Sequence, residues 1–225
     1  MKRETLICAH SGADGFEDNS LAYLRRAIGS EAEIFEIDVR RGADGELRLG
    51  HDEADGGLPS LGEVFELAAA APDKRINCDL KERGLEEAVC ALAREKGLAG
   101  RIILTGSADA EKWATSEELR GSSELWVNIE EYVPELYSRF SEPGFPRAAA
   151  ESIAGLCRRC GVGTVNMHRR LAVPELKEVL LGAGLALSVW TVNEPEEIER
   201  FLREGTRSVT TRALAEALEI RKRLR

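Results

Sequence analysis

The stretch EIFEIDVRRGADGELRLGHDEA, residues 33–54, combines the pattern of a β-strand with charges that a buried strand rarely carries. Residues 35, 37 and 39 are apolar and alternate with Glu36 and Asp38, so the two sets face opposite sides of the predicted strand. Branched apolar side chains normally fill the interior of a parallel barrel. Two inward carboxylates near the end of a strand therefore indicate an active site. The alternative is a pair of exposed carboxylates at a strand edge.

Short β-rich runs alternate with amphipathic helical runs along the whole chain, which is the pattern of an α/β protein with parallel strands. Strands are predicted at residues 5–10, 33–39, 75–80, 101–106, 124–129, 163–168, 185–191 and 207–211, and helices at 19–29, 60–71, 84–97, 173–184 and 194–205. Eight such units predict a single (β/α)8 TIM-type barrel domain spanning residues 1–225. The doubly wound alternative would need a glycine-rich phosphate loop after its first strand, and HSGADGFEDN lacks that spacing.

The apolar run LRLGH, residues 47–51, follows the second strand too closely for a parallel crossover. Asp44-Gly45 between them is a strong hairpin signal, so we expect a β-hairpin excursion after the second strand. With Asp44 and Gly45 as the two central turn residues, Asp38 would lie opposite His51. From His51 to Asp79 there is room for one helix but not for a sizeable cap insertion, so the site should be shallow and open.

The composition suits one globular domain, because 43% of the 225 residues are hydrophobic. A formal net charge of −9 argues against a nucleic-acid partner, since phosphate backbones are bound by clustered Lys and Arg. No apolar run is long enough for a signal peptide or a membrane span, so we expect a cytoplasmic protein without integral membrane association. Five cysteines predict no disulfide framework, and Cys157 and Cys160 are expected to be ordinary helix residues because a second metal-ligand pair is missing.

A third carboxylate has the same placement as the first two. In RINCDLKE, Asn77, Asp79 and Lys81 alternate with apolar residues at the end of the next barrel strand. Grouped carboxylates would repel unless a cation compensated them, and oxygen ligands suit Mg²⁺ or Ca²⁺. We therefore expect Glu36, Asp38 and Asp79 to hold one divalent cation, with Lys81 beside it to meet an anionic group.

Two of the three histidines are assigned to the same rim. His10 ends the first strand, and the hairpin brings His51 towards Asp38. Histidines beside a carboxylate–metal site are candidates for general acid and general base. His168 also ends a strand, without an acidic motif beside it, and is kept as a candidate substrate contact.

Six short motifs follow one another along most of the chain. They are His10-Ser11-Gly12, Glu17-Asp18-Asn19-Ser20, Glu36-x-Asp38, Asp44-Gly45 before His51-Asp52, Asp79-x-Lys81, and Trp190-Thr191-Val192-Asn193. This ordered combination resembles the signature of the glycerophosphodiester phosphodiesterases, within the phospholipase-C-like phosphodiesterase barrels. The resemblance implies a phosphoric diester hydrolase of glycerol and lipid metabolism, with a small-molecule substrate.

The resemblance also implies roles for individual residues. Glu36, Asp38 and Asp79 would hold the divalent metal, and His10 and His51 would form the acid–base pair. Residues on the substrate side would be Ser11, Asn19, Lys81, His168 and Trp190. The attacking hydroxyl, from the substrate's glycerol or from water, stays open, as do Mg²⁺ against Ca²⁺, the preferred head group and the oligomeric state.

The chain departs from the family pattern at several positions. Ser11 stands where the family has a phosphate-gripping arginine, and a serine supplies neither its charge nor its two-pronged geometry. Asp18 and Asp79 replace glutamates, and Arg212 lies near a family Thr-Asp-Pro segment. Arg40 or Arg169 could supply the missing charge. Three functions stay open: an active metal-dependent phosphodiesterase, a weakened barrel that only binds a phosphorylated ligand, and an unrelated barrel enzyme such as a metal-dependent aldolase or isomerase.

Overall fold

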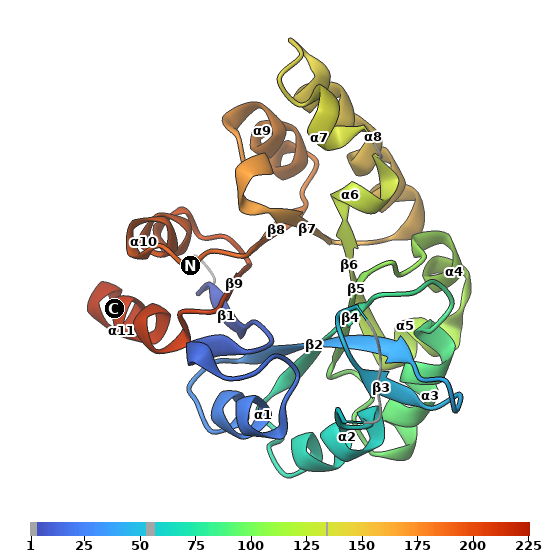
Figure 1. Ribbon diagram of the computed structural model, residues 1–225. Coiled ribbons are helices and arrows are strands. Elements are labelled where there is room, and N and C mark those ends of the chain that lie inside the picture. Colours follow the sequence, from blue (N-terminus) through green and yellow to red (C-terminus); the bar gives the residue numbers. More distant parts are fainter. Residues whose placement is uncertain (1–3, 53–56, 134) are drawn as a thin grey trace.

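The computed structural model describes residues 4–52, 57–133 and 135–225, so the predicted domain range 1–225 includes a few positions outside the described residues. Within these ranges eight parallel strands form a closed barrel with the helices around its outside (Figure 1). The barrel strands are β1 (Leu6–Ala9), β2 (Ile34–Arg41), β4 (Arg75–Leu80), β5 (Ile102–Gly106), β6 (Ser123–Asn128), β7 (Thr164–His168), β8 (Ala186–Trp190) and β9 (Ser208–Thr211). Strand β1 pairs with both β2 and β9, which closes the barrel. The predicted TIM-type fold and its strands are confirmed.

The helices that carry a clear apolar period were predicted, and of the others only the end of α8 (Phe145–Cys160) was, where Cys157 and Cys160 are helix residues as expected. The predicted helices are α1 (Leu21–Ile28), α2 (Leu61–Ala69), α3 (Glu86–Glu95), α9 (Pro174–Gly182) and α10 (Pro195–Glu204). The others are α4 (Ala110–Thr115), α5 (Glu117–Ser122), α6 (Ile129–Tyr132), α7 (Leu136–Arg139), α8 (Phe145–Cys160) and α11 (Leu214–Leu224), with short 3₁₀ turns η1 (Ala13–Gly15) and η2 (Arg169–Leu171). All five cysteines are free and buried, as expected. None of the described helices is long and apolar enough to cross a bilayer.

The predicted hairpin exists, but its register was wrong by one residue. Strand β3 (Leu47–Leu49) pairs antiparallel with the end of β2, and Val39 faces Leu49. The turn has three residues, because Gly42 N–H donates to Glu46 O at 2.8 Å, and Gly45 takes a positive φ of 86°. The extra turn residue places Gly50 opposite Asp38, with Gly50 N–H donating to Asp38 O at 3.1 Å. The predicted pairing of Asp38 with His51 is therefore replaced by a backbone contact.

The barrel wall separates an outer apolar layer from an inner polar one. Outward residues of the strands pack with the helices in one large buried cluster, to which Phe35, Ile37 and Val39 belong as predicted. A smaller buried cluster inside the barrel contains Cys8, Ile34, Ile103 and Trp126. Further along β2 the inward residues are Glu36 and Asp38, beyond Ile34 in the same alternating set. The carboxyl ends of the strands therefore form a polar mouth above an apolar floor.

Two connections at this mouth differ in length. Between β2 and β4 the described residues contain the hairpin strand β3 and the single helix α2, which agrees with the absence of a sizeable cap insertion. Between β6 and β7 the chain carries α6, α7 and the 16-residue helix α8. This longer connection was not predicted, and it extends beyond the ring of helices in Figure 1.

Candidate active site

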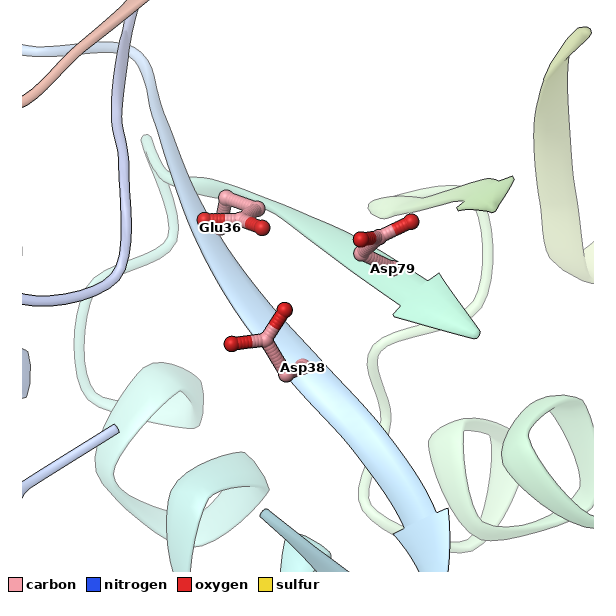
Figure 2. Close-up of side chains that lie close together, drawn as sticks. All are labelled: Glu36, Asp38 and Asp79. Atoms are coloured by element: carbon pink, nitrogen blue, oxygen red, sulfur yellow. The ribbon is translucent and has the colours of Figure 1, made fainter. Parts of the chain in front are cut away.

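Three carboxylates gather at the carboxyl ends of neighbouring strands. Glu36 and Asp38 lie on β2 and Asp79 on β4, and Asp38 is the direct register partner of Asp79. Each residue offers an oxygen within 4.8 Å of the others'. Figure 2 shows the three side chains grouped on the inner surface of the two strands. The structure thus brings together the three metal ligands predicted from strand alternation.

Two buried polar residues, Ser11 and Asn19, donate hydrogen bonds to the carboxylates of Glu36 and Asp38. Ser11 N–H donates to Glu36 Oε2 at 2.7 Å, and Ser11 Oγ donates to Asp38 Oδ2 at 3.2 Å. Asn19 donates its side-chain N–H to Asp38 Oδ2 at 2.8 Å and accepts Asp38 N–H at 3.0 Å. Ser11 is 0% and Asn19 1% exposed. Both residues were predicted on the substrate side, and in the structure their polar groups are committed to the carboxylates.

The electrostatics of the cluster leave room for a cation. The Lys81 ammonium lies 2.8 Å from Asp38 Oδ1 and also contacts the Asp79 carboxylate, so it offsets one negative charge. Burial is the largest influence on the pKa of Asp38 and disfavours the charged carboxylate. Lys81 and Asn19 nevertheless bring this pKa below its ordinary value. Burial, together with Asp38 and Asp79, raises the pKa of Glu36 to about 7 although His10 opposes the rise. Carboxylate oxygens whose negative charge is only partly balanced are suitable ligands for a hard divalent cation.

The absence of a side chain at Gly106 leaves space for the Asp79 carboxylate. Gly106 ends the neighbouring strand β5 and has a positive φ of 67°, and an added Cβ would lie 2.4 Å from Asp79 Oδ1. Thr105 Oγ1 lies 3.3 Å from the same oxygen and donates to Asn77 Oδ1 at 2.8 Å. A side chain at position 106 would therefore push the third carboxylate out of the cluster.

The two predicted acid–base histidines line the same cavity, of about 460 Å³, as the carboxylates. His10 Nδ1 lies 2.9 Å from Ser11 O and 3.6 Å from Glu36 Oε2, at the base of this cavity. His51 lies at the rim just after β3, with its side chain 62% exposed and its Nδ1 2.8 Å from Asp52 Oδ1. The geometry offers one enclosed and one solvent-facing histidine across a common space.

The wall across the cavity from the carboxylates comes from β6, β7, β8 and the long β6–β7 connection. Among its residues are Asn128, Asn166, Glu130, Glu131, Tyr137 and Trp190. Only Trp190 was predicted. The two asparagines continue the inward alternation of their strands, which could have identified them. Tyr137 lies in α7, where no periodic signal marks it.

His168 takes a supporting position rather than a place on this wall. Its ring contacts Trp190 edge-on at 5.3 Å between centroids and Tyr137 at 6.4 Å. Its backbone N–H donates to Glu130 Oε1 at 3.1 Å. Burial, together with Arg169 and Arg170, lowers the pKa of His168. The side chain therefore orients two aromatic rings that border the cavity.

The arginines considered as substitutes for the family residue are engaged elsewhere. Arg40 Nε donates to His51 O at 2.9 Å, and Arg169 forms an ion pair with Glu197. Arg212, after β9, instead binds Asp18 through two hydrogen bonds of 2.7 and 2.6 Å. The Arg212–Asp18 pair lies against Gly12 in the loop that follows His10, so it fixes that loop.

A closed parallel barrel with a carboxylate cluster and two histidines at its carboxyl-terminal mouth defines a TIM-barrel protein with a candidate metal-centred active site. No protein-family model matches the chain. A curated relative from Caldanaerobacter subterraneus subsp. tengcongensis, named glycerophosphodiester phosphodiesterase, is 23% identical, and the match covers 92% of this chain and 94% of the relative. The resemblance to glycerophosphodiester phosphodiesterases seen in the motifs is thus confirmed.

Solved structures under the same name share the fold. The glycerophosphodiester phosphodiesterase from Thermotoga maritima has a TM-score of 0.73 at 20% identity, with all of both chains covered. A phosphodiesterase from Oleispira antarctica, in complex with the product sn-glycerol-3-phosphate, has a TM-score of 0.71 at 16% identity, with 96% of each chain covered. At these identities the structural likeness establishes the TIM-barrel fold.

Proposed function

We propose that this chain is a metal-dependent phosphodiesterase that cleaves glycerophosphodiesters into glycerol 3-phosphate and an alcohol. The observation that carries the proposal is the group of three carboxylates within 4.8 Å, with the Lys81 ammonium against two of them and His10 beside the third. The name of the curated relative and the bound product of the Oleispira structure support the same substrate class.

Glu36, Asp38 and Asp79 would hold one Mg²⁺ or Ca²⁺, which when bound supplies positive charge to the phosphoryl oxygens. Lys81 adds a second cationic contact to the same oxygens as a point charge. Ser11 and Asn19 keep the carboxylates in place through their buried hydrogen bonds. Without an arginine at position 11, phosphate binding depends on Lys81 and the bound cation.

His10 and His51 divide the proton transfers between them. One imidazole accepts the proton of the attacking hydroxyl as its oxygen bonds to phosphorus, and the other donates a proton to the alkoxide as the bond from phosphorus breaks. If the hydroxyl belongs to the substrate's glycerol, the first product is a cyclic phosphate, and water then opens it. Trp190 borders the organic part of the substrate, with His168 holding its ring.

A barrel that binds a phosphorylated ligand without turnover is the second candidate, because Ser11 carries no charge for phosphate. The two are separated by incubating the protein with glycerophosphocholine, Mg²⁺ or Ca²⁺, and measuring released glycerol 3-phosphate with and without a chelator. Release that depends on the cation supports the phosphodiesterase, whereas binding without release supports the second candidate. We place the activity in the cytoplasm, which suits five free thiols.

A further inference from the structure

The cavity wall across from the carboxylate cluster is acidic and aromatic. Glu130 and Glu131 follow β6 at the start of α6, and Tyr137 and Trp190 border the same cavity. The four side chains will be called the far wall. Glu130 links parts of this wall by hydrogen bonds, because its Oε1 accepts the Tyr137 hydroxyl at 3.0 Å and His168 N–H at 3.1 Å. Glu130, Tyr137 and, through His168, Trp190 are therefore connected to one another.

Burial raises the pKa of Glu130, so the negative charge of the far wall comes mainly from Glu131, and nothing described in the cavity offsets it. Lys81 is the only Lys or Arg among the described residues that line the cavity, and it is bound to Asp38 and Asp79. A divalent cation and Lys81 would together balance the three clustered carboxylates. Glu130 Oε2 is buried without a hydrogen-bond partner. A phosphodiester adds another negative charge to this space.

The aromatic rings on the far wall have the chemistry that recognises organic cations. Tyr137 is 57% exposed and presents its ring to the cavity mouth, and Trp190 lies at the carboxyl end of β8. Ring faces attract ammonium groups, and carboxylates nearby add to the attraction. The His168 ring packs edge-on against both and fixes their orientation. Neutral polyols lack the positive charge that the ring faces and the carboxylates attract.

Resting on the proposed function, we infer that the far wall selects glycerophosphodiesters whose alcohol carries an alkylammonium group, such as choline or ethanolamine. The phosphate of such a zwitterion lies at Lys81 and the carboxylate cluster, and its ammonium lies between Tyr137, Trp190 and the two glutamates. The long β6–β7 connection thus takes the role of an enclosing element. This inference replaces the shallow, open site that was expected from the absence of a sizeable cap insertion.

The test compares kcat/KM for glycerophosphocholine and glycerophosphoethanolamine with that for glycerophosphoglycerol and glycerophosphoinositol at fixed cation concentration. The wild-type protein should prefer the ammonium diesters by roughly tenfold, the size expected for a cation–π contact backed by carboxylates. Tyr137→Leu and Glu131→Gln should reduce the preference to near unity, mainly by raising KM for the ammonium diesters. Tyr137→Phe, which keeps the ring, should retain most of it.

The control is Glu178→Gln, which removes one negative charge from the surface helix α9 outside the cavity and should leave the preference unchanged. Equal kcat/KM for all four diesters in the wild type would overturn the inference while leaving the proposed function intact. A uniform loss for all four in Glu131→Gln would also overturn it, because it would place the shared glycerol at the far wall. If no diester is cleaved, the proposed function fails. The inference is then tested by calorimetric dissociation constants for the same four compounds. Binding of the ammonium diesters that is roughly tenfold tighter supports it, and equal binding overturns it.

Discussion

The Lys81 ammonium lies 2.8 Å from Asp38 Oδ1, and Asp38 is 1% exposed. Asp38 is therefore a buried charge whose cationic partner also contacts Asp79. Burial works against the charged form of Lys81, yet Asp79 and Asp38 raise its pKa above the ordinary value. This relationship makes Lys81 both a stabilising residue of the free protein and a cationic contact for phosphate.

Removing Lys81 should destabilise the cation-free protein. Lys81→Met leaves Asp38 charged and buried, and breaking a buried pair by deleting one partner typically costs about 3–5 kcal/mol. Urea unfolding in chelator measures the change, and saturating Ca²⁺ should recover part of the loss. Lys177→Met is the matched control, because it breaks a surface pair with Glu204 that is worth about 0–1 kcal/mol. Equal costs for the two variants would contradict the role given to Lys81.

Asp79 should be required for binding of the divalent cation. Asp79→Asn keeps the size of the side chain and removes its charge, and changes even to outer partners of metal ligands cost about 10–100-fold in affinity. Calorimetric titration with Mg²⁺ and Ca²⁺ should show a loss at least that large. The control Asp73→Asn changes an exposed aspartate before β4 and should bind the cation like the wild type. Unchanged affinity in Asp79→Asn would remove it from the ligand set.

The histidines should affect turnover more than folding. His10→Ala and His51→Ala should each lower kcat by roughly 10²–10⁴-fold, the usual contribution of a proton-transfer group. His51 is solvent-facing, so its variant should unfold at the same urea concentration as the wild type. Steady-state kinetics on glycerophosphocholine give the result. A variant that retains wild-type kcat would exclude that histidine from proton transfer.

Glu36 should make the cation-free protein less stable as the pH rises. Its pKa of about 7 lies above the ordinary 4.5, so between these values the folded state binds more protons than the unfolded state. The stabilising protonation is fully present below pH 4.5 and is lost as the pH rises through 7. In chelator, wild-type stability should therefore fall from pH 5 to 8 relative to Glu36→Gln, by at most about 3 kcal/mol. Parallel pH profiles for the two proteins would contradict the raised pKa.

The barrel and the carboxylate cluster could be predicted because local patterns determine both. Strand alternation put Glu36, Asp38 and Asp79 on the inner face, and parallel pairing brought them together at one end of the barrel. His10 followed from the same reasoning about strand ends, whereas His51 followed from the predicted hairpin, whose register was off by one residue. These features depend on residue period and strand order, which the sequence carries directly.

Other features depend on contacts that the sequence does not encode locally. The hairpin register was wrong because Asp44-Gly45 fits both two- and three-residue turns, and only the Gly42–Glu46 hydrogen bond and the strand pairing in the fold distinguish them. Tyr137 reaches the cavity through the tertiary position of α7, a four-residue helix without an apolar period. Ser11 was interpreted as a lost phosphate contact, and its role as a support for Glu36 and Asp38 required the distances.

The most direct test of the phosphodiesterase proposal is ³¹P NMR of glycerophosphocholine incubated with the protein, first with excess Mg²⁺ or Ca²⁺ and then with excess chelator. The account predicts that the diester resonance is replaced by that of glycerol 3-phosphate with a cation present, directly or through a cyclic phosphate, and persists in chelator. A diester resonance that stays unchanged with both cations, or that disappears equally in chelator, would contradict it.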